Sequence, residues 1–461
     1  MLFSSNIFLF AFLPVVLSVY YLSPRRLRNP VLLLFSLFFY GWGEPVYLIL
    51  MIFTIGLNYV CGLLIHRFRT QKSPEKKILI VGVAANLLLL AFFKYSGFLA
   101  TQLQAVLPVL QGWKIPEIPL PIGISFYIFQ SMSYIIDVYR EDTPVQKNLL
   151  SFGTYVALFP QLIAGPIVRY RDVAWQLDNR RETLSGFSSG VVLFVIGLSK
   201  KVLLANPMGS LWNLLQAQPG TLCAWVGVFA YSLQIYFDFS GYSDMARGLG
   251  RMLGFEFLEN FNYPYISRSV TEFWRRWHIS LSTWFREYVY IPLGGNRLGL
   301  GRQIVNLLIV WTLTGLWHGA SWNFVLWGLY YAILLIFEKV FLFKQLNQLP
   351  PFVGHCYTIA AFALGWVLFY FEDMVALGRF LQRLFVWEAS QSHGMTFILS
   401  YLPLMAAAAL AATPVMKRLF CRYQNAALIR FARILGTLGL LLLCTAALVS
   451  QSYNPFIYFR F

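Results

Sequence analysis

The chain has 461 residues, of which 58% are hydrophobic, 18% aromatic and only 12% charged, whereas about a quarter of a soluble domain is charged. This composition excludes a soluble globular protein and predicts an all-α integral membrane protein with roughly ten to twelve spans of about 20 residues each. The 36 Lys and Arg residues against 19 Asp and Glu give a net charge of +17, which in so apolar a chain indicates loops against an anionic membrane leaflet. Membrane lipid is therefore an expected partner, and nucleic acid is not.

The first third of the chain alternates apolar segments with basic clusters. Residues 1–22 are apolar and lack a basic leader, and Arg25, Arg26 and Arg28 follow them, which predicts an uncleaved first span. Apolar runs at 30–40 and 46–65 separate this cluster from a second one at 67–77. If both clusters are cytoplasmic, the N-terminus lies outside. A third basic cluster, within residues 417–433, places the C-terminal tail outside as well.

The apolar segment 152–167 is interrupted by Pro160, Gly165 and Pro166, and arginines follow it at once. Proline removes a backbone donor, and broken helices at membrane depth are tolerated where protein or a cavity surrounds them. Two interpretations stay open, a re-entrant segment and a kinked ordinary span. Because no repeat and no hinge rich in Ser or Gly occurs, we expect one polytopic domain over residues 1–461, with a catalytic segment at 241–319.

Residues 241–302 carry eight basic residues, and all of them are arginine. Helical spacing places aromatic residues from Trp274 to Phe285 on one face and arginines on another, which predicts an amphipathic interfacial helix. Arginine suits bidentate recognition of phosphate or carboxylate, whereas a lipid anchor would accept lysine equally. Anchoring and binding of an anionic donor therefore both stay open for Arg275, Arg276 and Arg286.

His318, in the tripeptide Trp317-His318-Gly319, stands between the apolar runs 304–316 and 321–337. An imidazole in hydrocarbon loses its hydration, so such a residue usually faces a polar cavity and has a task there. Gly315 and Gly319 are expected to thin the walls around it. A packing histidine bonded to a carbonyl is the alternative, but we predict that His318 is catalytic, with Trp317 and Asn323 as substrate-binding candidates.

Two further polar residues stand in apolar contexts. His278 lies on the predicted aromatic face, where a structural and a chemical role are equally compatible with the sequence. Asp238 could orient a histidine or cap a broken helix, and the structural role is favoured.

The chemistry is narrowed by what the sequence lacks. It contains no Gly-x-Ser-x-Gly elbow, Walker loop or dinucleotide fingerprint, and its five cysteines have no ligand spacing, so neither a metal nor a bound cofactor is expected. A neutral imidazole can take the proton of an alcohol that attacks an acyl thioester. The alternatives are a transporter or flippase with a gating histidine, whose paired broken helices are not visible here, and a passive export scaffold.

Several motifs resemble those of the membrane-bound O-acyltransferase (MBOAT) superfamily and, within it, the bacterial alginate O-acetyltransferase group. The resemblance spans the chain and rests on these segments: Met1-Leu-Phe-Ser-Ser-Asn6, Phe159-Pro-Gln-Leu-Ile-Ala-Gly-Pro166, Asp238-Phe-Ser-Gly-Tyr-Ser-Asp244, Glu272-Phe-Trp-Arg-Arg-Trp-His278, Tyr290-Ile-Pro-Leu-Gly-Gly295, Trp317-His-Gly319 and Tyr458-Phe-Arg-Phe461. It implies a helical bundle around a funnel or tunnel, with His318 as the active-site histidine. It makes His278 the second active-site position, which is Asn or Asp in some relatives. The tail departs slightly, with Arg460 where Gln is expected.

The same resemblance implies a reaction. A cytoplasmic thioester, acetyl-CoA or an acyl carrier, is the expected co-substrate, and the acetyl group passes across a bacterial inner membrane. An extracytoplasmic polysaccharide, alginate-like or peptidoglycan, is the expected acceptor, and a periplasmic or surface esterase-like acetyltransferase is the expected partner. In this scheme His318 is the base, and His278 is expected to position the acyl carbonyl or stabilise its developing charge.

Overall fold

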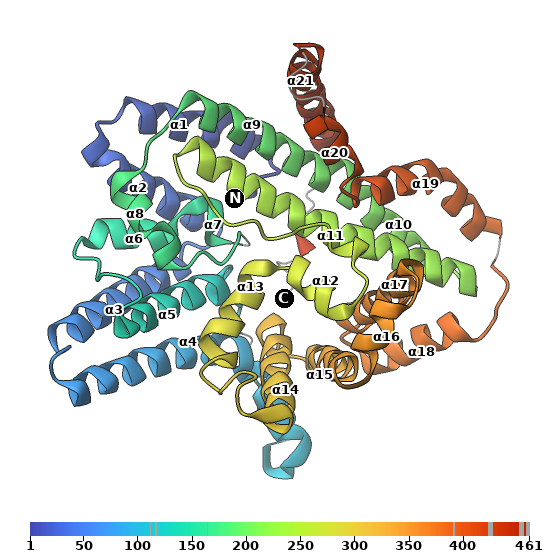
Figure 1. Ribbon diagram of the computed structural model, residues 1–461, viewed down its shortest axis with the longest axis horizontal. Coiled ribbons are helices and arrows are strands. Elements are labelled where there is room, and N and C mark those ends of the chain that lie inside the picture. The colour runs from blue at the N-terminus through green and yellow to red at the C-terminus, as the bar shows by residue number, and fades with distance from the viewer. Residues whose placement is uncertain are drawn as a thin grey trace. The chain divides into compact units, whose positions relative to one another are not determined.

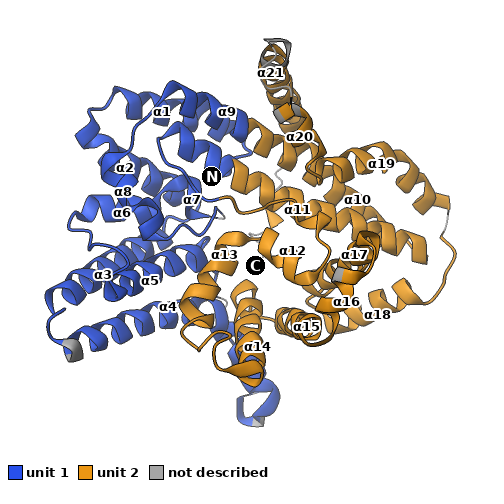
Figure 2. Cartoon of the chain, in the orientation of Figure 1, with its two compact units in different colours: residues 1–194, 245–258 blue, residues 195–244, 259–461 orange. Residues whose placement is uncertain are grey.

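The computed structural model describes residues 1–110, 112–115, 118–163, 165–390, 392–422, 427–450 and 456–457, and all regular elements within these ranges are helical. The chain forms two compact units (Figure 2). Unit 1 contains residues 1–194 and 245–258, and unit 2 contains residues 195–244 and 259–461. Helices α9 (Leu184–Ser199) and α11 (Thr221–Met252) each contribute residues to both units. The single domain expected over residues 1–461 stays a prediction.

Unit 1 holds the N-terminal helices, drawn in blue to green in Figure 1. Helices α3 and α4 both pack against α5, which is buried along nearly its whole length because it is covered on several sides. The helices of this unit are α1 (Leu13–Leu22), α2 (Arg28–Gly41), α3 (Tyr47–Arg67), α4 (Lys72–Val106), α5 (Ile124–Arg140), α6 (Leu149–Ala157), α7 (Phe159–Leu162) and α8 (Tyr170–Asn179).

The interrupted segment 152–167 forms two short helices rather than one span. α6 has nine residues and α7 has four, and Leu158 between them leaves the helical conformation with ψ of 111°. The proline at 160 lies at the start of α7, where its missing N–H costs no helical hydrogen bond. Because about 20 residues are needed to cross a bilayer, these helices do not form the kinked ordinary span. The re-entrant path stays a prediction.

Unit 2 carries His278 and His318 and a large aromatic core. Its helices, besides parts of α9 and α11, are α10 (Asn206–Gln216), α12 (Val270–Arg276), α13 (Ile279–Phe285), α14 (Gly299–His318), α15 (Trp322–Phe337), α16 (Phe343–Gln348), α17 (Pro351–Tyr370), α18 (Met374–Phe385), α19 (Ser392–Ala411), α20 (Val415–Arg422) and α21 (Ala427–Ser450). Short π-helical turns follow several of them, including one at Lys200–Ala205 after α9.

Eight helices of the described residues are long and apolar enough to cross a membrane. They are Tyr47–Arg67, Pro74–Val106, Leu184–Gln216, Thr221–Met252, Trp322–Leu346, Pro351–Tyr370, Ser392–Ala411 and Phe431–Ser450. This number is smaller than the ten to twelve spans expected from the chain length, because apolar segments such as α2 and α5 form helices of only 14 and 17 residues. Phe8–Leu22 is a further apolar helix below the spanning length.

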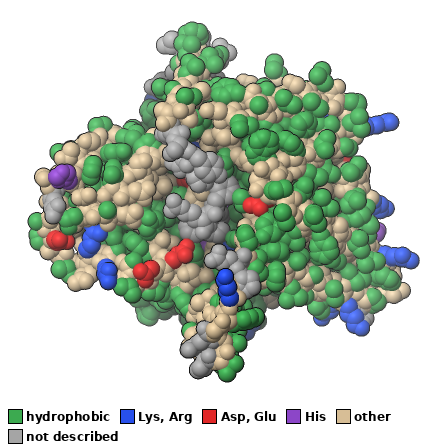
Figure 3. Space-filling view, turned by 180° about the vertical axis from the view of Figure 1, so that it is seen from behind, with side chains coloured by type: hydrophobic (Ala, Val, Ile, Leu, Met, Phe, Trp, Pro, Cys, Tyr) green, Lys and Arg blue, Asp and Glu red, His purple; other side chains and the backbone are tan. Residues whose placement is uncertain are grey.

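Large hydrophobic side chains lie exposed along these helices, as on the face drawn in Figure 3, where charged side chains are few. Ile49, Leu88 and Leu442 are each about 70% exposed, although each lies within a helix of spanning length. So much contiguous apolar surface is unfavourable in water, whereas it is in favourable contact with the hydrocarbon chains of lipid. The chain is therefore a multi-pass membrane protein.

Candidate active site

His318 is the last residue of α14, at the tip of the α14–α15 hairpin. The hairpin is closely packed because Gly315 and Gly328 let the two backbones meet. A Cβ on either glycine would overlap a backbone oxygen of the facing helix, at Phe324 and Trp311 respectively. A Cβ on Gly319 would overlap the Phe324 ring. The expectation that Gly315 and Gly319 thin a cavity wall is therefore wrong, because α15 fills the space beside them.

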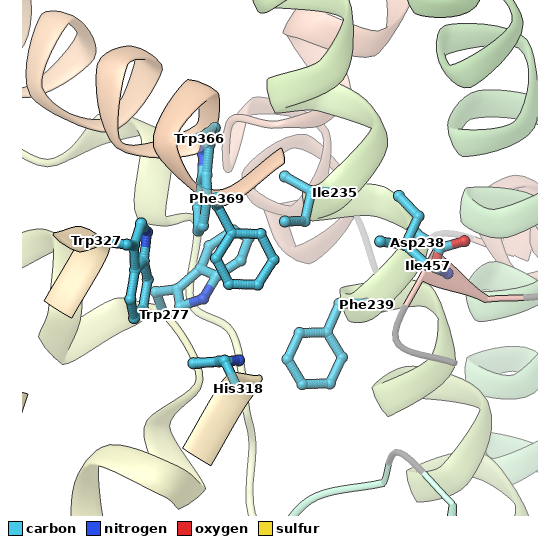
Figure 4. A pocket seen from close by; sticks show the side chains of 9 residues that line it. All are labelled: Ile235, Asp238, Phe239, Trp277, His318, Trp327, Trp366, Phe369 and Ile457. Atoms are coloured by element: carbon cyan, nitrogen blue, oxygen red, sulfur yellow. The ribbon is translucent and has the colours of Figure 1, made fainter. Parts of the chain in front are cut away.

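A pocket in unit 2 opens beside His318 (Figure 4). It has about 360 Å³ of atom-free space, open mouth included. His318 and Asp238 are its only ionisable lining groups among the described residues. The lining residues are Ile235, Asp238, Phe239, Trp277, His318, Trp327, Trp366, Phe369 and Ile457.

The imidazole of His318 lies in an aromatic setting and is buried. Its ring centroid lies 5.0 Å from that of Trp327 and 5.2 Å from that of Phe369, in both cases nearly perpendicular. Trp327 and Phe369 are themselves in contact, with centroids 5.3 Å apart. Such interlocked rings fix the orientation of the imidazole and keep bulk water from it.

The second histidine lies at a break between two helices. α12 ends at Arg276, Trp277 is extended, and His278 has φ 43° and ψ 54°, the left-handed conformation, before α13 begins at Ile279. The continuous amphipathic helix predicted from Trp274 to Phe285 is therefore wrong. The spacing of apolar side chains indicates which face of a helix is buried, but it does not predict a left-handed residue whose conformation is stabilised by a residue distant in sequence.

Asn260 stabilises that reversal. Its side-chain oxygen accepts hydrogen bonds from the Ser280 backbone N–H at 3.1 Å and from the Ser280 hydroxyl at 3.0 Å, and its backbone oxygen accepts from the Ile279 N–H. The same side-chain oxygen lies 3.3 Å from Nδ1 of His278. This oxygen can accept from Nδ1, and the Ser280 hydroxyl, 3.4 Å from the same nitrogen, can donate to it, so the contacts fit either tautomer of His278.

His278 is 1% exposed and lies outside the eight candidate spans. Burial lowers the pKa of His278 to about 3, so the ring is neutral at physiological pH. The expected task of His278, to position the acyl carbonyl or stabilise its developing charge, stays a prediction.

The start of α12 is fixed by two side chains. The Ser269 hydroxyl caps it by accepting from the Glu272 N–H at 3.0 Å. The buried carboxylate of Glu338, just beyond α15, accepts from the backbone N–H groups of Val270 and Thr271 and from the Thr271 hydroxyl. A carboxylate at a helix N-terminus satisfies its free N–H groups and its dipole. The segment carrying His278 is thereby tied to α15.

The remaining predicted site residues are not in the pocket lining. Trp317 is buried between the two histidines, with ring centroids 5.0 Å from His318 and 6.0 Å from His278. Asn323 donates to the backbone oxygens of Leu368 and Phe369, at 3.3 and 3.1 Å. It therefore fixes the end of α17, which carries two pocket-lining rings. Substrate binding by Trp317 and Asn323 stays a prediction.

The three predicted arginines differ from one another. Arg275 is exposed, and Arg286 is exposed with its guanidinium 3.3 Å from Glu287. Arg276 bonds Glu272 through Nε and Nη2 and the Asn262 backbone oxygen through Nη1. None of them lines the pocket. The donor-binding role of the three stays a prediction.

Asp238 lies within the pocket wall, and its two carboxylate oxygens have structural partners. Oδ1 is 2.5 Å from Nζ of Lys201, and Oδ2 accepts from the Ile457 backbone N–H at 2.8 Å. The favoured structural role agrees with these contacts, although the partners are Lys201 and Ile457 rather than a broken helix end.

Sequence reasoning missed several residues of this site. Trp327 and Trp366 lie inside ordinary apolar runs, and Asn260 lies in a loop 18 residues before its histidine, so no local signal marks them. Among the described residues no group of three or more His, Cys, Asp or Glu side chains could hold a metal ion. The tail motif at 458–461 and Ala164 lie outside the described residues.

Comparison with known proteins shows which family the chain resembles. The model of MBOAT, the membrane-bound O-acyltransferase family, matches residues 143–377, which include both histidines. The chain is 41% identical to the probable alginate O-acetylase AlgI of Pseudomonas putida, with 100% of both chains covered. It is 35% identical to a peptidoglycan O-acetyltransferase of Helicobacter pylori, over 80% of this chain and 77% of that one. It is 30% identical to a teichoic acid D-alanyltransferase of Streptococcus thermophilus, over 49% and 58% of the two chains.

Proposed function

We propose that the pocket at His318 is the site of acyl transfer in this chain, which belongs to the membrane-bound O-acyltransferase family. The reaction moves an acetyl group from a cytoplasmic thioester toward an extracytoplasmic polysaccharide. The family makes the chain an O-acyltransferase, so the transporter and scaffold alternatives have no support. The observation that carries the proposal is the position of His318, the one imidazole in the lining of an otherwise mostly apolar pocket.

The chemistry follows from that setting. As a neutral base, His318 takes the proton of an acceptor hydroxyl while its oxygen attacks the thioester carbon. The carbon–oxygen bond forms, the carbon–sulfur bond breaks, and the proton passes from His318 to the departing thiolate. The aromatic walls at Trp327 and Phe369 exclude water, which would otherwise hydrolyse the thioester. His278 does not line this pocket, and its role as the second active-site histidine stays a prediction.

The acceptor and donor are inferred from the relatives. Two of these relatives are named for O-acetylation of alginate and of peptidoglycan. In both reactions the acceptor is a hydroxyl group of a polysaccharide. Acetyl-CoA or an acyl carrier thioester is the donor, and an esterase-like acetyltransferase outside the membrane is the partner that passes the acetyl group from the hydroxyl acetylated at His318 to the polysaccharide. The protein lies in a bacterial inner membrane with its N-terminus outside, as the basic clusters at 25–28 and 67–77 indicate.

Thioester cleavage by the purified protein in lipid nanodiscs tests the proposal. We expect it to release free thiol from acetyl-CoA when an oligosaccharide acceptor is supplied, and to release little without one because the pocket excludes water. His318→Asn should lose this activity, whereas the exposed His393→Asn should retain it as a matched control. Equal thiol release by wild type and His318→Asn would contradict the proposed site. Absence of release with both acetyl-CoA and acetylated carrier protein would contradict the donor chemistry.

A further inference from the structure

Ile457 lines one side of the pocket, and with its neighbour Phe456 it lies far in sequence from the helices around it. The backbone N–H of Ile457 donates to Oδ2 of Asp238 at 2.8 Å. The other carboxylate oxygen of Asp238 is paired with Lys201, and these two side chains are only 4% and 2% exposed. The carboxylate therefore joins α11 to the turn after α9 and to Phe456–Ile457.

Phe456 adds two contacts to this attachment. Its ring is 1% exposed and stands edge-on to the Tyr242 ring, with centroids 4.4 Å apart. Nζ of Lys201 lies 4.8 Å from the Phe456 ring centroid, a cation–π distance. Lys201 therefore contacts both the carboxylate that bonds Ile457 and the ring that precedes it. Phe456 and Ile457 are thus held by one backbone hydrogen bond, one aromatic contact and one cation–π contact.

A buried ion pair is weak evidence for stability, because desolvation of the two charges offsets most of their attraction. Its consequence here is geometric. Ile457 enters the pocket lining beside Asp238, across from Trp327 (Figure 4). The opposite wall is made of interlocked rings, since Trp277 and Trp366 lie 4.7 Å apart and Trp327 contacts Phe369. Those rings are packed against one another, whereas Ile457, like Ile235, presents an aliphatic side chain to the pocket.

We propose that Ile457, held in place by the Lys201–Asp238 pair, determines the size of the acyl group that the pocket accepts and restricts it to short chains. This inference rests on the proposed function, in which the pocket at His318 receives the acyl thioester. One additional methylene against a rigid apolar wall changes a specificity ratio by about 10- to 200-fold. Truncation of Ile457 removes three carbon atoms from that wall.

The test compares kcat/KM for acetyl-CoA and butyryl-CoA, measured as thiol release by the full chain in nanodiscs. Ile457→Ala should shift the ratio toward butyryl-CoA by at least about tenfold. Ile398→Ala is the matched control, because Ile398 is buried in the same unit but does not line the pocket, and its ratio should equal that of wild type. An unchanged ratio in Ile457→Ala overturns the inference, as does a wild type that uses butyryl-CoA as well as acetyl-CoA.

A second variant tests the positioning role. Lys201→Met with Asp238→Leu replaces the buried pair by apolar side chains, which proteins commonly tolerate. The double variant should fold and show the same direction of shift in the ratio as Ile457→Ala, because Ile457 loses its anchor. A folded double variant with wild-type selectivity overturns the positioning role. If the wild-type protein cleaves neither thioester, the proposed function itself is overturned. If Ile457→Ala changes the rates but keeps the ratio of kcat/KM for the two thioesters, only this inference is overturned.

Discussion

The ring of His278 lies 6.0 Å from that of Trp317, edge-on at 70°, and the adjacent His318 ring lies 5.0 Å from the same indole. One buried tryptophan thus separates two histidines that lie 40 positions apart in sequence. Only His318 belongs to the pocket lining, whereas His278 is held by Asn260 at the junction of α12 and α13. The two rings therefore have different environments, and their substitution should have different consequences.

His318→Asn should abolish acetyl transfer, because it removes proton abstraction, which typically contributes 10² to 10⁴ in rate. His278→Asn should keep measurable activity, since an amide oxygen can still accept a hydrogen bond. The measurement is acetyl content of the cell's glycan, or acetyl-CoA turnover in vesicles, with a blot that shows equal amounts of each variant in the membrane. Robust activity in His318→Asn would refute its role as base. Complete loss in both variants would show that the two histidines are equally necessary.

The pKa of His278 predicts a pH effect on stability. In the folded protein this pKa is lowered to about 3 by burial, against an ordinary value of about 6.5. Between these pH values the unfolded chain binds a proton that the folded protein does not. Protonation of His278 therefore leaves the free energy of unfolding unchanged above pH 6.5 and lowers it progressively as the pH falls toward 3. Wild type should therefore lose more thermal stability between pH 7 and 4.5 than His278→Gln, which lacks the titrating group.

Thermal unfolding of both proteins in the same detergent, at several pH values, measures this difference. Parallel losses in wild type and variant would show that His278 is not held neutral by burial. The pH dependence of the acetyl-transfer rate is a second test, because a His278 ring that stays neutral cannot change the activity between pH 5 and 8. The rate profiles of wild type and His278→Gln should therefore have the same shape in that range.

The sequence predicts two apolar runs with His318 between them, and the structure forms them as α14 and α15. The sequence does not predict the break at His278, because the hydrogen bonds that stabilise the left-handed backbone come from Asn260 in a preceding loop. The Lys201–Asp238–Ile457 contact escapes it for the same reason, since it joins residues up to 256 positions apart. Local patterns thus predict elements, whereas the pocket is made by long-range contacts.

The arginines near α12 and α13 can be tested by changes that keep their charge. Arg275 and Arg286 are exposed, so each can offer its guanidinium to an anionic donor. Arg275→Lys and Arg286→Lys should each raise KM for acetyl-CoA about tenfold, the loss of one charge-assisted hydrogen bond. Arg276→Lys should raise KM less than either, because the Arg276 guanidinium already bonds Glu272 and the Asn262 oxygen. An unchanged KM in both exposed variants would leave these residues as membrane anchors only.

The close approach of α14 and α15 predicts an uneven response to alanine along α14. Gly315→Ala should destabilise the protein by several kcal/mol and lower the rate, because the new Cβ meets the backbone oxygen of Phe324, which cannot move as a side chain would. Gly301→Ala, in the same helix, has no heavy atom within 4 Å of its new Cβ and should be neutral or stabilising, since alanine favours helix by about 1 kcal/mol over glycine. The measurement is the midpoint of thermal unfolding in detergent together with acetyl-CoA turnover. If Gly315→Ala matched Gly301→Ala in both, the backbone contact that places His318 beside Trp327 would not be as tight as the structure has it.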